Sequence, residues 1–180
     1  MPKLDSTRYT LLFATAVSVV CALLVATAAV GLRERQGINA ELYKQKNVLL
    51  AAGLTKPGEA LSTAEINTLF ERRIQVRSVD LQSGQLLAEG QFDVANYAQR
   101  RARNDPALSR PVAANDAQIA RLPKIAKVFQ VTGSDGKLEQ IVLPIEGMGM
   151  WGTMYGLLAM DRDGNTVRGL TFYEQKETPG

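Results

Sequence analysis

The 180-residue chain contains no histidine and a single cysteine, Cys21. Without histidine, these residues cannot form a histidine-type zinc site or a Ser-His-Asp triad, and they lack the usual acid–base group that titrates near neutral pH. Because Cys21 lies inside a long apolar run, the polar part of the chain has neither a disulfide nor a thiolate nucleophile. Any redox chemistry here therefore requires a bound organic cofactor or a partner.

The chain also lacks a strong excess of charge, since its formal net charge is only +3 at pH 7. That balance argues against nucleic acid as a partner. One basic cluster stands out, formed by Arg100, Arg101, Arg103 and Arg110. Two readings stay open for it: a solvated helical face, or a docking surface for a partner or for lipid headgroups.

Charged residues are absent from Thr10 to Leu32. As a helix this run is about 35 Å long, enough to cross a hydrocarbon core of about 30 Å. A cleaved signal peptide is the alternative, but its apolar part is usually about 7–15 residues. The run favours a retained anchor, which divides the chain into a short tail (1–9), a transmembrane helix (10–32) and a polar domain (33–180). Basic residues flank both ends, so charge leaves the orientation open.

The polar domain begins with helical patterns. We expect one helix capped by Asn39 and stopped by Gly53, and a second opened by the capping box Ser62-x-x-Glu65. A strand is predicted over 74–82, with a bulge where the alternation slips at Arg77-Ser78.

The second half predicts antiparallel hairpins. After a polar region (92–122) with a short helix and an irregular loop, one hairpin turns at 133–136 and another at 163–165. Asp161, Asp163 and Asn165 resemble the start of a calcium loop, but position 12 of that loop would be Phe172, so we interpret them as a turn. Helices followed by hairpins predict an α+β domain with helices packed on one sheet.

Three glycines, Gly147, Gly149 and Gly152, punctuate the stretch between the two hairpins. They allow sharp bends and close approach of the backbone to a ligand. Beside them stand aromatic and sulfur-containing residues: Trp151, the only tryptophan, Tyr155, Met148, Met150 and Met154. These side chains either fill a core, or stack against a planar aromatic ligand, or, through the methionines, bind copper.

The sequence "GMGMWGTMYGLLAM", then "DGNTVRGLTFYEQKETPG", and the earlier "KQKNVLLAAGL" resemble the C subunit of the bacterial sodium-translocating NADH:quinone oxidoreductases. The resemblance implies an FMN-binding type of domain behind one transmembrane helix. It also implies a protein that relays single electrons through a covalent FMN toward quinone (ubiquinone), coupled to sodium export. The G subunit of an Rnf-type complex, or a cofactor-free membrane-tethered scaffold or assembly protein, is the alternative.

The resemblance further implies a bacterial inner-membrane protein with a cytoplasmic N-terminus and a periplasmic domain. Its partners would be lipid and other subunits, especially B, D and E. NADH, iron–sulfur and other flavins would be bound by partner subunits. This chain alone is not expected to be catalytic, and no metal ligand is assigned.

The chain departs from the family in one respect, since no Ser-Gly-Ala-Thr string, the family's FMN attachment motif, occurs in it. We therefore expect it to correspond to about the N-terminal two thirds of such a protein, incomplete at the C-terminus. The attachment threonine would lie beyond residue 180, and Gly180 would stand within a flavin-side loop. The resemblance assigns cofactor contacts to Glu177, Thr178, Pro179 and Gly180, with Trp151 and Tyr155 as apolar walls. For Glu177 a solvent-exposed carboxylate is the alternative.

Overall fold

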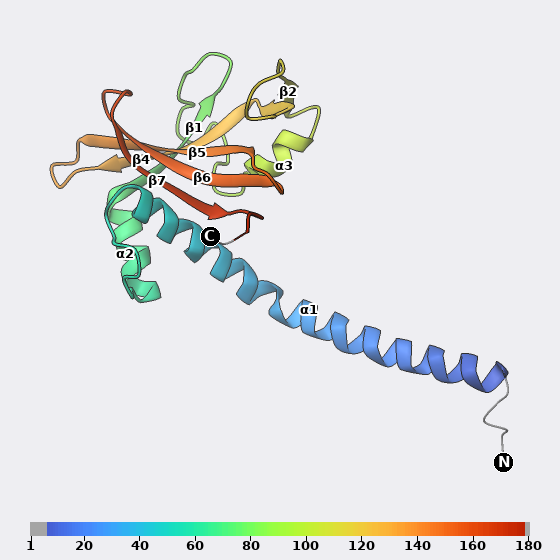
Figure 1. Cartoon of the computed structure of the whole chain (residues 1–180). Helices are drawn as coiled ribbons and strands as arrows, with labels where there is room; N and C mark the ends of the chain where they lie inside the picture. Colours follow the sequence, from blue (N-terminus) through green and yellow to red (C-terminus); the bar gives the residue numbers. More distant parts are fainter. Residues whose placement is uncertain (1–6, 179–180) are drawn as a thin grey trace. The chain divides into compact units, whose positions relative to one another are not determined.

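The computed structural model describes residues 7–178, and these divide into two compact units between Tyr43 and Lys44 (Figure 1). The first element, helix α1 (Thr7–Ala51), runs through the first unit into the second. Among the described residues it is the one helix long and apolar enough to span a membrane, with a mean hydropathy of 2.5 in its most apolar window. It contains the predicted transmembrane run.

The prediction that a separate helix begins at Asn39 is wrong, because α1 is continuous through this position. Before Asn39 the helix contains two glycines, Gly31 and Gly37, and no proline, and an isolated glycine costs a helix only about 1 kcal/mol. The predicted stop at Gly53 is confirmed. Its φ is +69°, its N–H donates to the Leu50 carbonyl (3.0 Å), and the Leu54 N–H donates to the Leu49 carbonyl (2.9 Å). This is the Schellman arrangement that glycine favours.

Helix α2 (Thr63–Arg73) confirms the predicted capping box. The Glu65 N–H donates to the Ser62 hydroxyl (3.3 Å), and the Ser62 N–H donates to the Glu65 carboxylate (2.8 Å). The Ser62 N–H, and after it the Ser62 hydroxyl, which also donates to the Glu65 carboxylate (2.7 Å), lower the pKa of Glu65. A cap of this kind contributes about 1 kcal/mol to helix stability.

Five antiparallel strands form the main sheet, in the order β1-β4-β5-β6-β7. The strands are β1 (Ile74–Asp80), β4 (Ile125–Thr132), β5 (Leu138–Met148), β6 (Thr153–Asp161) and β7 (Val167–Glu174). Both predicted hairpins are confirmed as β4–β5 and β6–β7, with Gly136 and Gly164 at positive φ in their turns. A third hairpin, β5–β6, joins them into a continuous meander. The fold is α+β, as predicted.

The bulge predicted at Arg77-Ser78 is wrong, because β1 pairs with β4 in unbroken register from Ile74 to Asp80. Ser78 continues the inward alternation and is 5% exposed. Arg77 lies on the opposite side of β1, where it bonds the Glu89 side chain (3.3 Å) and the Leu87 carbonyl (3.4 Å). The alternation of apolar residues therefore slips for two reasons. Ser78 places a small hydroxyl side chain at a buried position, and Arg77 lies on the other side of β1, which the chain around Leu87 and Glu89 also covers. The observed register shifts lie elsewhere, between Val131 and Thr132, and at two places along β6.

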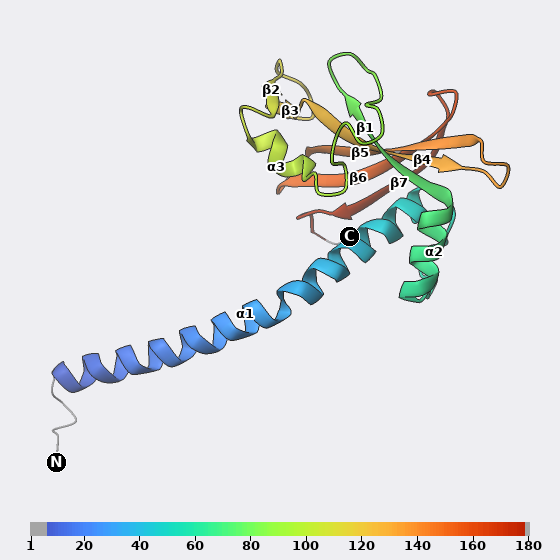
Figure 2. The same cartoon turned by 180° about the vertical axis from the view of Figure 1, so that it is seen from behind.

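The polar middle contains more regular structure than predicted. The predicted short helix is α3 (Gln99–Asn104), but the expected irregular loop also forms a two-stranded sheet of β2 (Ser109–Pro111) and β3 (Arg121–Pro123). Figure 2 shows these three elements grouped at the end of the main sheet where β6 begins. The strands are only three residues each, too short to be signalled by alternation.

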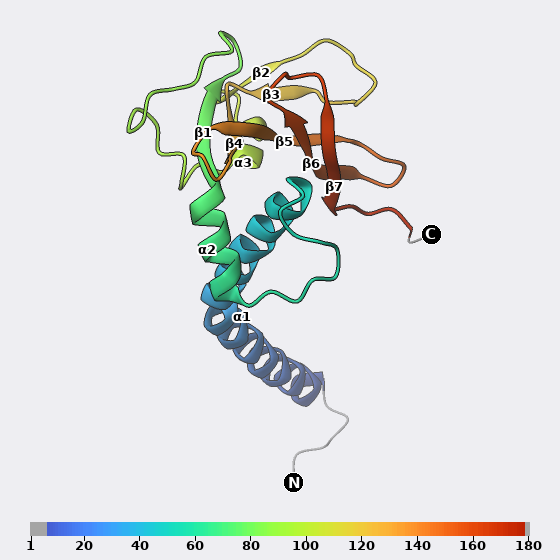
Figure 3. The same ribbon diagram turned by 90° about the vertical axis from the view of Figure 1, so that its left-hand side faces the viewer.

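The core of the second unit lies between the sheet and the C-terminal end of α1. Its buried apolar residues include Val48, Leu49, Ile74, Phe129, Val131, Val142, Leu157 and Ala159. Helix α1 approaches β7 so closely that a Cβ at Gly169 would overlap the Ala51 carbonyl oxygen (Figure 3). This contact fixes the side of the sheet on which the helix lies. It is near the start of β7, and the candidate site described below is at the other end of that strand.

Candidate functional site

The glycine-punctuated stretch forms the short loop 149–152 between β5 and β6. The last strand pair before it is Met148 with Thr153, and the Gly149 N–H closes the loop by donating to the Gly152 carbonyl (2.8 Å). Trp151 is 67% exposed and Met150 is 84% exposed. The reading in which these two side chains fill a core is therefore wrong.

A carboxylate from beyond β7 fastens this loop. The Trp151 N–H donates to Oε1 of Glu177 (3.1 Å), a residue 26 positions later in the chain. A Cβ at Gly149 would overlap the same carboxylate oxygen, and one at Gly152 would lie 3.0 Å from the Lys176 side chain. The two glycines thus admit the segment 176–177 against the loop. The predicted close approach is made here by the chain itself.

Next to the loop, three neighbouring strands place Glu146, Tyr155 and Glu174 in one row. Glu146 of β5 faces Tyr155 of β6, which faces Glu174 of β7. Arg100 of α3 lies across this row: its guanidinium carbon is 3.4 Å from the centre of the Tyr155 ring, and it pairs with Glu174 at 2.7 Å. A guanidinium over a tyrosine ring is a favourable cation–π contact.

Arg103, one turn later in α3, holds the other end of the row. It pairs with Glu146 at 2.6 Å, and both side chains are only about a fifth exposed, 18% and 21%. Burial alone would lower the pKa of both arginines, but hydrogen bonds to Glu146 and Glu174 outweigh it and raise the pKa. Two of the four arginines in the predicted basic patch are therefore bound to carboxylates of the domain itself.

The structure brings some of the sequence-predicted residues together. Trp151 and Glu177 meet through the hydrogen bond described above, and Thr178 follows at once and is exposed. Tyr155 belongs to the same end of the sheet, with one ring face under Arg100. Pro179 and Gly180 lie outside the described residues.

Four residues of this end were missed as a group: Arg100, Arg103, Glu146 and Glu174. The arginines stood out in the sequence, but their partners are 74 and 43 positions away. No local pattern links them. Only the strand register, which places both glutamates beside Tyr155, could have found the row.

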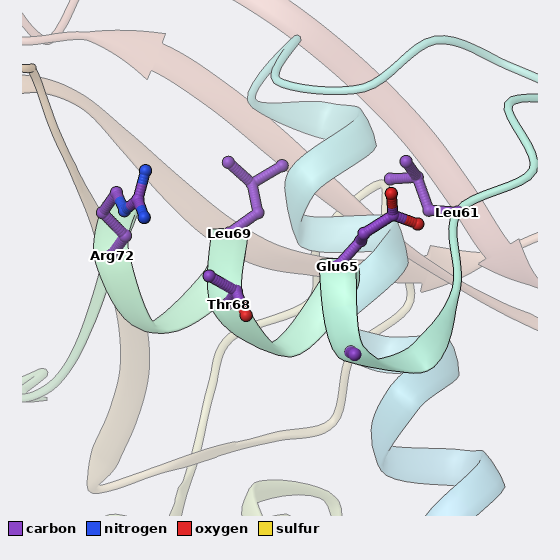
Figure 4. Close-up of a pocket in the computed structure, with 6 residues that line it drawn as sticks. Leu61, Glu65, Thr68, Leu69 and Arg72 are labelled. Atoms are coloured by element: carbon purple, nitrogen blue, oxygen red, sulfur yellow. The ribbon is translucent and has the colours of Figure 1, made fainter.

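A separate hollow of about 340 Å³ runs along α2 (Figure 4). It is lined by Leu61, Ala64, Glu65, Thr68, Leu69 and Arg72. Its carboxylate is already bonded to Ser62 in the capping box. The remaining lining is mostly apolar, so the hollow offers no converging polar groups for chemistry.

Residues 149–180 match the FMN-binding domain family. The chain is 43% identical over 182 aligned residues to the C subunit of the Na(+)-translocating NADH-quinone reductase of Pseudomonas aeruginosa, covering all of this chain and 68% of the relative. For the same protein of Vibrio vulnificus the identity is 40%, with the same coverage. The crystal structure of Shewanella oneidensis NqrC has a TM-score of 0.68 at 30% identity, and the match covers 78% of this chain and 63% of that one. The chain thus spans about two thirds of the length of these proteins.

Proposed function

Because the chain belongs to the family of C subunits of the Na(+)-translocating NADH-quinone reductases, we propose that it is a membrane-anchored electron-transfer component of such a complex. Its proposed role is to relay single electrons toward quinone, coupled to sodium export. The observation that carries the proposal is that the family match and the fastened loop begin at the same residue. The FMN-binding family match begins at Gly149, and the same residues form the loop that Glu177 fastens.

The side chains at this loop fit an aromatic cofactor. Trp151, Met148 and Met150, in and next to the loop, are all exposed, which leaves apolar side chains free to contact a flat ring. FMN, when bound, supplies one-electron redox chemistry. The protein's part in such a relay is to hold and shield the ring, so no residue here needs to act as an acid or base.

Each predicted contact residue takes a distinct proposed role. Trp151 is a wall of the flavin site. The Thr178 hydroxyl and the backbone N–H of Gly180, the residue after Pro179, are donors to polar edges of the ring. Glu177 holds the loop through the Trp151 N–H. Tyr155 supports the site from under Arg100. Hydrogen bonds to a flavin tune its reduction potential, which gives the donors their function.

Covalent attachment of FMN is proposed to use a threonine outside these 180 residues, since no Ser-Gly-Ala-Thr string occurs in them. The other cofactors, NADH, iron–sulfur and further flavins, belong to partner subunits, with B, D and E as the proposed neighbours. The proposed location is the bacterial inner membrane. Helix α1, the candidate membrane span, is proposed to cross the bilayer and contact lipid. The proposed orientation has a cytoplasmic N-terminus and a periplasmic domain.

The test is FMN titration of the full chain in detergent micelles, followed by the emission of Trp151, the only tryptophan. We expect saturable quenching of Trp151 emission, and weaker FMN binding in Thr178→Val, which removes a donor but keeps the side-chain shape. Arg101→Gln, an exposed position in α3, is the control and should bind as the wild type does. Quenching that never saturates would contradict the proposal and favour the cofactor-free scaffold.

A second measurement tests the attachment. The 180-residue chain is expressed together with a flavin-transfer enzyme and run on a denaturing gel under ultraviolet light. We expect no fluorescent band, because binding here is reversible. A fluorescent band at the mass of this chain would place the attachment inside it.

The G subunit of an Rnf-type complex is less well supported, since the relatives described above are all C subunits of the sodium-translocating reductase.

A further inference from the structure

Helix α3 is tied to four strands of the main sheet at the end where the loop 149–152 lies. At its start, the Lys127 N–H of β4 donates to the Gln99 side chain (2.7 Å). Arg103 pairs with Glu146 of β5, and Arg100 contacts Tyr155 of β6 and Glu174 of β7. A six-residue helix has little stability of its own, so these ties hold it in place.

The pair that Arg100 holds lies at the end of an edge strand, beyond a break in the strand register. Tyr155–Glu174 is the last pair of β6 and β7, and a register shift separates it from the next pair, Gly156–Phe172. Strand β7 is also the last in the strand order, so among the described residues no strand pairs with its outer edge. A terminal pair beyond a bulge on an edge strand frays unless side chains hold it.

From this pair the chain runs directly into the candidate site in both directions. Trp151 lies just before the start of β6, and Glu177 lies three residues after Glu174. The hydrogen bond between the Trp151 N–H and Glu177 therefore depends on the positions of the start of β6 and the end of β7. Arg100 touches both strands: its guanidinium covers Tyr155, pairs with Glu174, and donates to the Tyr173 hydroxyl at 3.3 Å.

We propose that Arg100 is a positioning residue for the flavin site: it clamps the last β6–β7 pair, and so fixes the Glu177 carboxylate on the loop that presents Trp151. The proposal deepens the proposed function and rests on it. Its action is mechanical rather than electrostatic at long range, because Glu174 neutralises the guanidinium at 2.7 Å. A planar guanidinium is needed, since it must lie flat on a ring and pair with a carboxylate at the same time.

The test uses the single tryptophan. When only tryptophan is labelled with ¹⁵N, the full chain in detergent micelles gives one backbone amide signal, that of Trp151, whose hydrogen exchange reports the bond to Glu177 directly. Glu177→Ala defines the exchange rate of the loop without its acceptor. We expect Arg100→Gln to exchange about fivefold faster than the wild type. Arg101→Gln, the exposed neighbour, should not change the rate.

FMN affinity is measured on the same samples by quenching of Trp151, and should fall about fivefold in Arg100→Gln and not in Arg101→Gln. Arg100→Lys keeps the charge and loses the planar group, so its exchange rate should lie between those of the wild type and Glu177→Ala. This variant decides the question if Arg100→Gln does not fold. The inference would be overturned if a folded Arg100→Gln protein had the exchange rate and the FMN affinity of the wild type. If Arg100→Gln does not fold, a wild-type exchange rate in Arg100→Lys would overturn it. If the wild type binds no FMN while Arg100→Gln still speeds hydrogen exchange of the Trp151 amide, the role of Arg100 as a clamp stands and the proposed function is wrong.

Discussion

Strand β6 has a connection at each end, and the two differ in the side chain that holds them. The β6–β7 turn closes itself: Asp163 accepts hydrogen bonds from the Asn165 N–H (2.9 Å), the Thr166 N–H (2.9 Å) and the Thr166 hydroxyl (2.7 Å). The β5–β6 loop has one closing hydrogen bond of its own, from the Gly149 N–H to the Gly152 carbonyl (2.8 Å), and is held in addition from outside, by Glu177 on the Trp151 N–H. The side chain that holds the first connection comes from its own sequence, and the one that holds the second comes from a distant segment.

This difference separates a structural turn from a candidate site. A self-closed turn is held by groups of its own residues, and its carboxylate accepts from two backbone N–H groups and one hydroxyl of that turn. A loop held by a distant side chain is correctly shaped only when the domain is correctly packed. Binding residues on such a loop are positioned by the scaffold behind them. At this end of the sheet, the scaffold is the row Glu146–Tyr155–Glu174 with the two α3 arginines.

The largest expected effect comes from Gly156→Ala at the site end. A Cβ there would lie 2.7 Å from the Thr171 carbonyl oxygen and 2.9 Å from the Phe172 ring, so the β6–β7 pairing must open. Overpacking against backbone of this kind costs about 2 kcal/mol of unfolding free energy. The matched change in a turn is Gly136→Ala, where φ is +75° but space is open, and the cost is about 1 kcal/mol of left-handed strain.

Urea unfolding of the full chain in detergent, followed by circular dichroism, measures both variants. If Gly136→Ala proves the more costly of the two, the turns and not the packing limit the stability of this sheet, and the comparison fails.

The second expected effect is smaller and compares two ion pairs. Arg103→Gln removes the partner of Glu146 where both side chains are about one fifth exposed, and should cost about 1–2 kcal/mol. Lys137→Gln breaks the pair with Asp135 in the β4–β5 turn, where the side chains are 78% and 57% exposed, and should change stability by less than about 0.5 kcal/mol. The same urea titration measures them. Equal losses would show that burial of the site-end pair contributes nothing.

The local half of this comparison is what a sequence can predict. The capping box at Ser62, the stop at Gly53 and both hairpin turns follow from residues next to one another, and each is confirmed. Where local pattern was the only guide, it also misled. Asn39 looks like a helix cap although α1 passes through it, and Ser78 looks like a bulge although the register is unbroken.

The candidate site divides in the same way. The glycines and Trp151 could be singled out from the sequence, because their residue types are unusual in such a short stretch. The contacts that organise them could not, since Arg100 and Glu174 are 74 positions apart and meet only through the sheet register. Their pairing is a property of the fold. The predicted cofactor contacts themselves stay predictions until FMN binding is measured.

The smallest expected effect is a matter of pH in the self-closed turn. The hydrogen bonds from Thr166 and Asn165 lower the pKa of Asp163 from its ordinary 3.8 to about 2. A depressed carboxyl pKa means that the folded state favours the ion, so this contribution is fully present above about pH 4 and is lost as the pH falls through about 2. Carbon-13 NMR of the Asp163 carboxyl should show its midpoint near pH 2. Thr166→Val removes the hydroxyl donor but keeps both backbone donors, so the midpoint should rise only part of the way toward 3.8. A midpoint at 3.8 in the wild type would mean that the turn does not close itself, and the contrast between the two ends of β6 would disappear.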